Sequence, residues 1–88
     1  MYQQAALITG GATRLGRFFS EALADAGFDI ALHVNRSREE AEEVANSIRS
    51  KGRECEIFHC DFLSEGLSEE LRDLIQAAKK RFPGLNLL

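Results

Sequence analysis

The chain reads Ala5-Ala6-Leu7-Ile8-Thr9-Gly10-Gly11-Ala12-Thr13-Arg14-Leu15-Gly16 from residue 5 to residue 16. Its apolar start is typical of a buried strand, and apolar residues recur at helical spacing from Leu15 onward. A glycine-rich turn between a strand and a helix can hold a diphosphate, because backbone N–H groups at the helix start face the anion. Gly10 and Gly11 permit backbone angles closed to other residues, and the missing side chain at Gly16 lets helix and strand pack closely. The stretch therefore predicts the first strand–turn–helix unit of an α/β fold.

The same alternation continues along the chain. Predicted strands cover residues 4–9, 28–34, 53–60 and 85–88. Helices are expected from Leu15 to a stop at Gly27, from a capping box at Ser37 to Gly52, and from a cap at Ser68 to Arg81. Short connections in a βαβαβαβ order require a parallel sheet with right-handed crossovers. We interpret residues 1–88 as the N-terminal portion of a doubly wound Rossmann fold, interrupted within or just after the fourth strand.

Each predicted helix carries an apolar stripe that is expected to face the sheet. The stripes are Leu15, Phe18, Phe19, Ala22, Leu23 and Ala26 in the first helix, Ala41, Val44, Ala45 and Ile48 in the second, and Leu71, Leu74, Ile75 and Ala78 in the third.

Composition narrows the class of protein. With 88 residues and 44% hydrophobic content the chain is one small globular unit, and no apolar run approaches the roughly 20 residues of a membrane span. A net charge of −3 argues against a nucleic-acid surface. The N-terminus lacks a secretory pattern, so a cytoplasmic location is expected. So short a chain is marginal as a free-standing domain, and we expect it to be incomplete.

Two cysteines, Cys55 and Cys60, lie five residues apart on one predicted strand. An odd separation on a strand directs side chains to opposite faces, so no disulfide is expected between them. Their spacing also suits no metal site, and we predict none.

The glycine turn resembles that of the short-chain dehydrogenase/reductase family, which reads T-G-x-x-x-G-x-G. Thr9, Gly10 and Gly16 match this pattern, whereas Arg14 replaces the middle glycine. The same replacement is typical of pteridine reductases, whose turn reads T-G-x-x-x-R-[IL]-G, with Leu15 at the penultimate position. The resemblance implies cofactor contacts from Gly10, Thr13, Arg14, Leu15 and Gly16.

Arg14 is the most specific of these candidates. A guanidinium beside the cofactor diphosphate can form charge-assisted hydrogen bonds to phosphate or polarise a substrate oxygen. The alternative is an exposed arginine without a ligand, but a cation at a helix N-terminus is unfavourable unless an anion balances it.

The end of the second predicted strand favours NADP(H) over NAD(H). NAD-binding relatives place an acidic residue there to accept hydrogen bonds from the ribose hydroxyls, but the chain reads His33-Val34-Asn35-Arg36-Ser37, and Asp29 lies at the other end of the strand. Arg36 can pair with a 2′-phosphate and Ser37 can donate its hydroxyl. The pattern His-x-x-Arg-Ser also resembles pteridine reductases, which makes His33 and Asn35 candidates. Alternatively, Ser37 only caps the next helix, Arg36 is solvated, and His33 is a packing residue.

Asp61-Phe62 follows the third predicted strand and resembles the family's Asp-[Leu/Val] pair. The resemblance implies that the Asp61 carboxylate meets the adenine amino group and that the backbone N–H of Phe62 meets a ring nitrogen. A loop aspartate is otherwise a common turn former. His59, just before this pair, has no partner at metal-binding or catalytic spacing, and we interpret it as structural.

The family's catalytic residues have no counterpart in this sequence. Hydride transfer in the family depends on a Tyr-x-x-x-Lys pair, a serine and an asparagine that follow the fourth strand, whereas the only tyrosine here is Tyr2. The resemblance implies that a longer parent protein transfers hydride from NADPH to a carbonyl or C=N bond of a small-molecule substrate, while this chain alone is inactive. Pteridine-reductase-like activity is preferred over 3-oxoacyl-acyl-carrier-protein-reductase-like activity. The alternatives are a catalytically inert nucleotide-sensing module and a scaffold that binds no nucleotide.

The family's sheet order places the fourth strand beside the first. A stub of strand at this edge leaves backbone groups available for pairing. We therefore expect a homo-oligomer, in which the fragment dimerises through the exposed edge or swaps its C-terminal segment.

Overall fold

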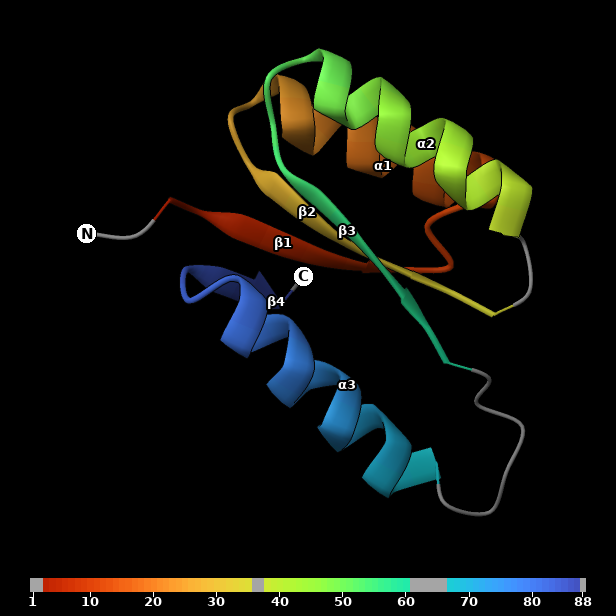
Figure 1. The fold of residues 1–88 in the computed structure, drawn as a ribbon, viewed down its shortest axis with the longest axis vertical. Helices are drawn as coiled ribbons and strands as arrows, with labels where there is room; N and C mark the ends of the chain where they lie inside the picture. The colour runs from red at the N-terminus through yellow and green to blue at the C-terminus, as the bar shows by residue number, and fades with distance from the viewer. Residues whose placement is uncertain (1–2, 36–37, 61–66, 88) are drawn as a thin grey trace.

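Four parallel strands form one sheet in the order β3-β2-β1-β4, as predicted. The computed structural model describes residues 3–35, 38–60 and 67–87. Helices α1 and α2 cover one face of the sheet and α3 covers the other (Figure 1). The elements are β1 (Ala5–Thr9), α1 (Arg14–Asp25), β2 (Asp29–Val34), α2 (Arg38–Ser50), β3 (Cys55–His59), α3 (Leu67–Arg81) and β4 (Leu85–Leu87).

The two central strands are covered on both faces. In β1, Ala6 and Ile8 contribute to the core under α1 and α2, whereas Ala5 and Leu7 contribute to the core under α3. All six residues of β2 are buried. A parallel strand with both faces covered reads as a continuous apolar run, which is why these strands could be recognised in the sequence.

The contact face of α1 differs from the predicted one. Gly16, Ser20 and Ala24 are its buried residues, whereas the side chains expected to be buried are largely exposed: 65% for Leu15, 65% for Phe18 and 48% for Phe19. At 3.6 residues per turn these three lie roughly 100–160° around the helix from the centre of the buried face. Only Leu23 of the predicted stripe packs against the core.

Close contact with the glycine turn explains why α1 buries a different face from the predicted one. Gly16 lies so close to the turn that a Cβ atom there would be 2.1 Å from the Gly10 carbonyl oxygen. Residues four apart share a helix face, so fixing Gly16 against the turn also directs Ser20 and Ala24 to the sheet. The small residues determine the contact because they allow the closest approach.

The stripes of α2 and α3 agree better with prediction. All four predicted residues of α2 are buried. In α3, Leu74 and Ala78 are buried and Ile75 packs partly against the core, but Leu71 is 39% exposed. The position of Ser68 as a helix cap is wrong, because α3 already begins at Leu67. Phe82, just beyond α3, completes the core on this face.

Candidate cofactor site

The glycine turn is held by hydrogen bonds of its own. Gly10 has φ of 61°, in the left-handed region that favours glycine. The Thr13 hydroxyl donates to the Gly10 carbonyl (2.7 Å) and accepts from the Gly16 N–H (3.1 Å). Thr13 is thereby the N-cap of α1. Its hydroxyl stabilises the turn, so any contribution of Thr13 to ligand binding comes on top of this role.

Gly11 is needed for space and not for a special backbone angle, because only Gly10 in this turn has a positive φ. A Cβ at Gly11 would lie 2.1 Å from Leu32 Cδ1 of the neighbouring strand. The Gly11 N–H donates to the His33 carbonyl (3.0 Å), which joins the turn to β2. The expectation of an unusual backbone angle is therefore correct for Gly10 and wrong for Gly11.

Arg14 is the first residue of α1 and is exposed. The first turn of α1 contains no acidic residue, and within the described parts of the chain Arg14 has no ion pair or hydrogen bond through its side chain. Arg17, one turn later, is instead engaged with Glu21 (3.3 Å) and Glu43 (3.8 Å). At the start of α1, Arg14 is therefore a cation without an ion-pair partner among the described residues, and the helix dipole there also favours a bound anion.

His33 is buried at the carboxyl end of β2. It is 3% exposed, and its Nε2 lies 2.8 Å from the Cys60 carbonyl. Together with the bond that its own carbonyl accepts from Gly11, this contact ties the glycine turn to the end of β3. His33 thus connects the loops around the site, in agreement with the packing alternative; a direct contact with the cofactor stays a prediction. Asn35, the next candidate, is exposed just beyond β2.

The only acidic residue of β2 lies at the end of the strand away from the glycine turn and is hydrogen-bonded there. Asp29 lies at the amino end of the strand, is 6% exposed, and accepts a hydrogen bond from the Glu54 N–H (3.0 Å). The carboxyl end of β2, next to the glycine turn, is therefore without a carboxylate among the described residues. This arrangement offers no acidic ligand for ribose hydroxyls and no charge that would repel a 2′-phosphate.

Four predicted contacts, Arg36, Ser37, Asp61 and Phe62, lie outside the described residues, as does Tyr2. The elements that flank them are described. β2 ends at Val34 and β3 ends at His59, both at the carboxyl end of the parallel sheet, where the turn after β1 also lies. The carboxyl ends of parallel strands are where ligands bind in open α/β sheets. The connections that carry these four residues therefore start at the carboxyl end of the sheet, where a ligand would bind.

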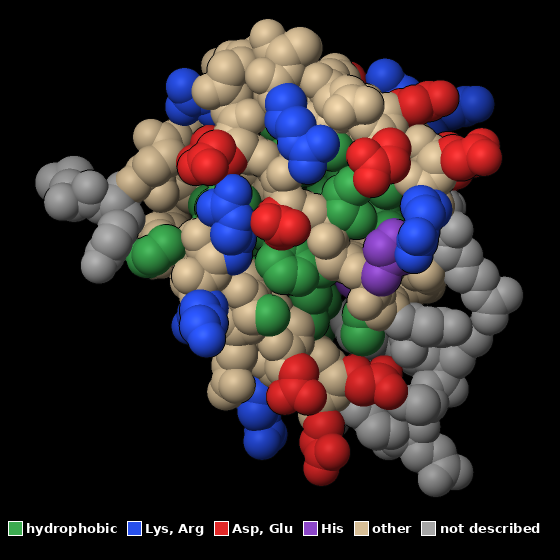
Figure 2. All heavy atoms as spheres, in the orientation of Figure 1, with side chains coloured by type: hydrophobic (Ala, Val, Ile, Leu, Met, Phe, Trp, Pro, Cys, Tyr) green, Lys and Arg blue, Asp and Glu red, His purple; other side chains and the backbone are tan. Residues whose placement is uncertain are grey.

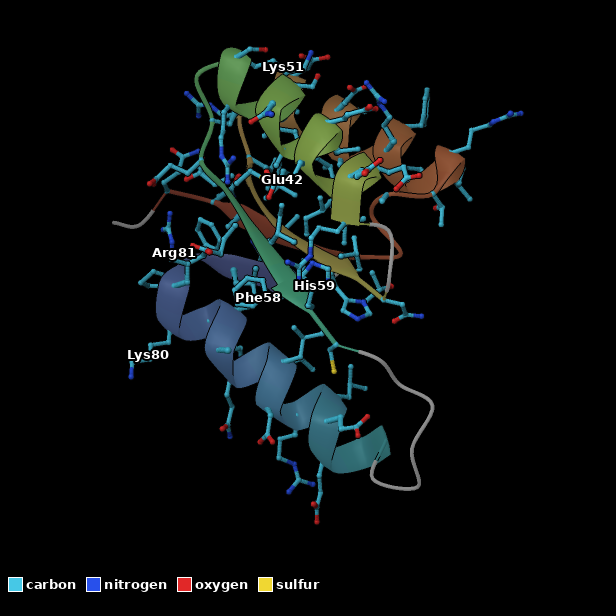
Figure 3. The ribbon with its side chains drawn as sticks, turned by 45° about the vertical axis from the view of Figure 1, so that its right-hand side comes forward. Glu42, Lys51, Phe58, His59, Lys80 and Arg81 are labelled. Carbon is cyan, nitrogen blue, oxygen red and sulfur yellow. The ribbon has the colours of Figure 1, made fainter. Side chains whose placement is uncertain are left out.

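Arg38 was not identified from the sequence. It is the first residue of α2 and lines a polar cavity of about 300 Å³ that also contacts His59 at the end of β3. Figure 3 shows His59 beneath the first turns of α2, with Glu42 above it. His59 is exposed, and its interpretation as a residue without a metal-binding or catalytic role stays a prediction. The signal that could have found Arg38 is the pair of arginines on either side of Ser37.

Cys55 is a free thiol, and no cluster suited to a metal ion occurs in the described part of the chain. Burial raises the pKa of the Cys55 thiol to about 11. It lies at the amino end of β3, away from the glycine turn, and a protonated buried thiol is a poor nucleophile. Among the described residues, no helix is long and apolar enough to cross a membrane.

Comparison with known proteins connects this site to a family. A family model described as short chain dehydrogenase matches residues 4–88. General stress protein 39 of Bacillus subtilis (strain 168) is 33% identical over 85 residues, which are 97% of this chain and 29% of that protein. The 3-oxoacyl-(acyl-carrier-protein) reductase FabG of Aggregatibacter actinomycetemcomitans is 40% identical over 55 residues, 62% of this chain and 23% of that protein.

Solved structures agree. FolM Alternative dihydrofolate reductase 1 from Brucella suis, in complex with NADP, has a TM-score of 0.75 at 35% identity and covers 90% of this chain and 30% of its own. A putative dehydrogenase from Burkholderia cenocepacia with bound NADP has a TM-score of 0.82 at 32% identity, covering 93% and 31%. The chain thus spans about a third or less of these relatives. It belongs to the short-chain dehydrogenase/reductase family and matches the N-terminal, cofactor-binding part of that family.

Proposed function

We propose that this chain binds the adenosine and diphosphate parts of NADP(H) and that it forms the cofactor-binding portion of a short-chain reductase. The observation that carries the proposal is Arg14. Its side chain is exposed at the start of α1, directly after the glycine turn, and forms no ion pair with the described residues. A phosphate at this position would receive both backbone N–H donors and a charged side chain.

The preference for NADP(H) rests on charge. The described carboxyl end of β2 offers no carboxylate, and the only acidic residue of that strand, Asp29, is hydrogen-bonded at the opposite end. Arg36 and Ser37 supply a cation and a hydroxyl for the 2′-phosphate, and Arg38 adds a second cation where α2 begins. The NADP bound to two of the structural relatives supports this assignment.

The reaction of a longer parent protein is reduction of a carbonyl or C=N bond of a small molecule by NADPH. A pteridine-reductase-like substrate is preferred over a 3-oxoacyl thioester, because Arg14 and the His-x-x-Arg-Ser pattern match the former group. The relative described as an alternative dihydrofolate reductase supports that choice. This chain contains none of the family's catalytic residues, so it binds cofactor without turning it over.

Titration calorimetry on the 88-residue chain tests the cofactor assignment. Adenosine 2′,5′-bisphosphate should bind more tightly than AMP, and Arg36→Met should reduce the difference. Loss of one charge-assisted hydrogen bond is worth about 1.5–3 kcal/mol, so the expected change in Kd is roughly 10- to 100-fold. Equal affinities for the two nucleotides in a folded sample would refute the NADP(H) assignment.

Arg14 is tested separately with NADP⁺, which carries the diphosphate. Arg14→Gln should weaken binding by a similar factor, whereas Arg17→Gln should not, because Arg17 is already paired with Glu21 and Glu43. Both variants lose one positive charge from the same helix, which makes Arg17→Gln a matched control. Equal effects of the two changes would mean that Arg14 acts only through net charge.

An inert nucleotide-sensing module is the alternative function, and only residues beyond Leu88 separate it from the reductase. It predicts the same binding results. The two functions separate in a longer parent protein: a downstream Tyr-x-x-x-Lys sequence with NADPH oxidation in the presence of a carbonyl or C=N substrate supports the reductase.

A further inference from the structure

The second strand, β2, carries two buried polar side chains, one at each end. Asp29 at the amino end is 6% exposed, and its carboxylate accepts a hydrogen bond from the Glu54 N–H (3.0 Å). His33 at the carboxyl end is 3% exposed, and its Nε2 lies 2.8 Å from the Cys60 carbonyl oxygen. A polar group is costly to bury unless it is hydrogen-bonded. Each side chain therefore fixes the backbone at one end of β3 relative to β2.

The backbone groups of these two residues extend both connections to β1. The Asp29 N–H donates to the Gln4 carbonyl (3.0 Å), just before β1. The His33 carbonyl accepts from the Gly11 N–H (3.0 Å), in the turn after β1. At each end of the sheet, one residue of β2 thus bridges the backbone that flanks β1 and the backbone that flanks β3. The glycine turn lies at the carboxyl end, so the His33 bridge is the one that adjoins the candidate cofactor site.

The contact with Cys60 fixes a proton on the His33 ring. A carbonyl oxygen can only accept a hydrogen bond, so Nε2 carries the hydrogen and donates it. Cys60 is also held through its own N–H, which donates to the Val34 carbonyl (3.1 Å). The residue before Asp61, the predicted adenine contact, is therefore attached to the end of β2 through both its N–H and its carbonyl.

We propose that His33 is a positioning residue that couples the diphosphate part of the cofactor site to the adenosine part. The inference rests on the proposed function, because it requires the glycine turn to bind phosphate. A phosphate that orders the turn also orders the hydrogen bonds from Gly11 through His33 to Cys60, and adenosine that binds next then loses less conformational freedom. The coupling is reciprocal, so each ligand tightens the binding of the other by the same factor.

Pyrophosphate, which contains no adenosine, tests the bridge in the unaltered chain by amide hydrogen exchange. Acidic and basic side chains are interspersed over the face shown in Figure 2, and no continuous basic patch on that face would compete with the turn for this probe. Saturating pyrophosphate should slow exchange of the Cys60 N–H by roughly fivefold or more relative to the Glu54 N–H. Glu54 is the internal control, because its N–H is bonded to Asp29 at the opposite end of the sheet. Equal protection of the two amides would overturn the inference.

Two neutral amides at position 33 test the reach of the side chain. Glutamine can place its amide nitrogen near the position of Nε2, whereas asparagine is one methylene shorter and cannot reach the Cys60 carbonyl. Binding of 2′-AMP, which has no group for the turn, is titrated with and without saturating pyrophosphate. The tightening by pyrophosphate should be roughly fivefold or more larger in the unaltered chain and in His33→Gln than in His33→Asn. Repulsion between the two anions is common to all variants and cancels in this comparison.

Asp29→Asn is the matched control. It changes the other buried polar side chain of β2 and should leave the coupling intact, because it lies away from the turn. Circular dichroism confirms folding, and His33→Leu replaces His33→Asn if the shorter amide prevents folding. Equal coupling in His33→Gln and the variant without a donor, or an equal loss in Asp29→Asn, would overturn the inference and leave His33 a purely structural residue. Failure of pyrophosphate or 2′-AMP to bind a folded chain would instead contradict the proposed function, and the inference would fall with it.

Discussion

Replacing Gly16 by alanine tests how closely α1 approaches the glycine turn. A Cβ at this position would lie 2.1 Å from the Gly10 carbonyl oxygen and 2.9 Å from Gly11 Cα. Overpacking costs about 1–3 kcal/mol, and we take about 3 kcal/mol because the opposing atoms belong to the backbone and cannot rotate away. Alanine regains about 1 kcal/mol through its higher helix propensity. The free energy of unfolding should therefore fall by about 2 kcal/mol.

Urea denaturation followed by circular dichroism measures this change. The denaturation midpoint should fall at constant m, and Tm should drop by roughly 8–16 °C for a chain of this size. The variant should also bind NADP⁺ more weakly, because the turn must move to accommodate the new methyl group. Gly52→Ala is the control: Gly52 has a positive φ but no neighbour within 4 Å of an added Cβ, so it should lose stability without losing binding.

The change in the free energy of unfolding on Gly16→Ala decides between close packing and helix propensity by its sign. If helix propensity dominated, the variant would be as stable as the parent chain or more stable. That result would refute the close approach of α1 to the turn. It would also refute the explanation for why α1 buries a different face from the predicted one.

Three further predictions concern the rest of the fold. Gly11→Ala and Leu32→Ala should each destabilise the chain, but the pair should cost at least about 0.5 kcal/mol less than the sum, because the added Cβ would occupy space vacated by Leu32; additive unfolding free energies would contradict this contact. Arg81→Met should cost no more than about 1 kcal/mol, since its ion pairs with Glu54 and Glu56 are solvent-exposed, and the difference should shrink in 1 M NaCl; a salt-independent loss would assign the effect to packing. Cys55 keeps its proton in the folded state up to a pKa of about 11, compared with 9.0 when unfolded, so stability should fall between pH 9 and 11 relative to Cys55→Ala; parallel pH profiles would disprove the raised pKa.

The glycine turn and α2 show what local sequence can specify. The turn needs a left-handed residue at Gly10, and glycine is the residue that adopts this conformation at least cost. The stripe of α2 is buried as predicted because its four small or branched residues are the only apolar side chains of that helix, so there is only one face to bury. In both cases the requirement is met by residues that are neighbours in the sequence or one helical turn apart.

The contact face of α1 could not be predicted in the same way. Hydrophobic spacing favoured Leu15 and Phe19, but the helix buries Gly16 and Ser20 instead. Periodicity ranks side chains by apolar character, whereas the approach of a helix to a sheet depends on which residues are small enough for backbone contact. Only the three-dimensional position of the Gly10 carbonyl reveals that constraint.

The sequence by itself determined the order of strands and helices, the turn that faces a phosphate, and the absence of an acidic residue where β2 ends. Each of these follows from local backbone preference, from hydrophobic period or from the charge of single residues. Tertiary structure alone decided that His33 is buried as a connector, that Arg38 and His59 share a cavity, and that apolar side chains of α1 line a cavity with β1. Those relationships join residues from different elements, and their distances are set by strand register and helix packing, which no local pattern encodes.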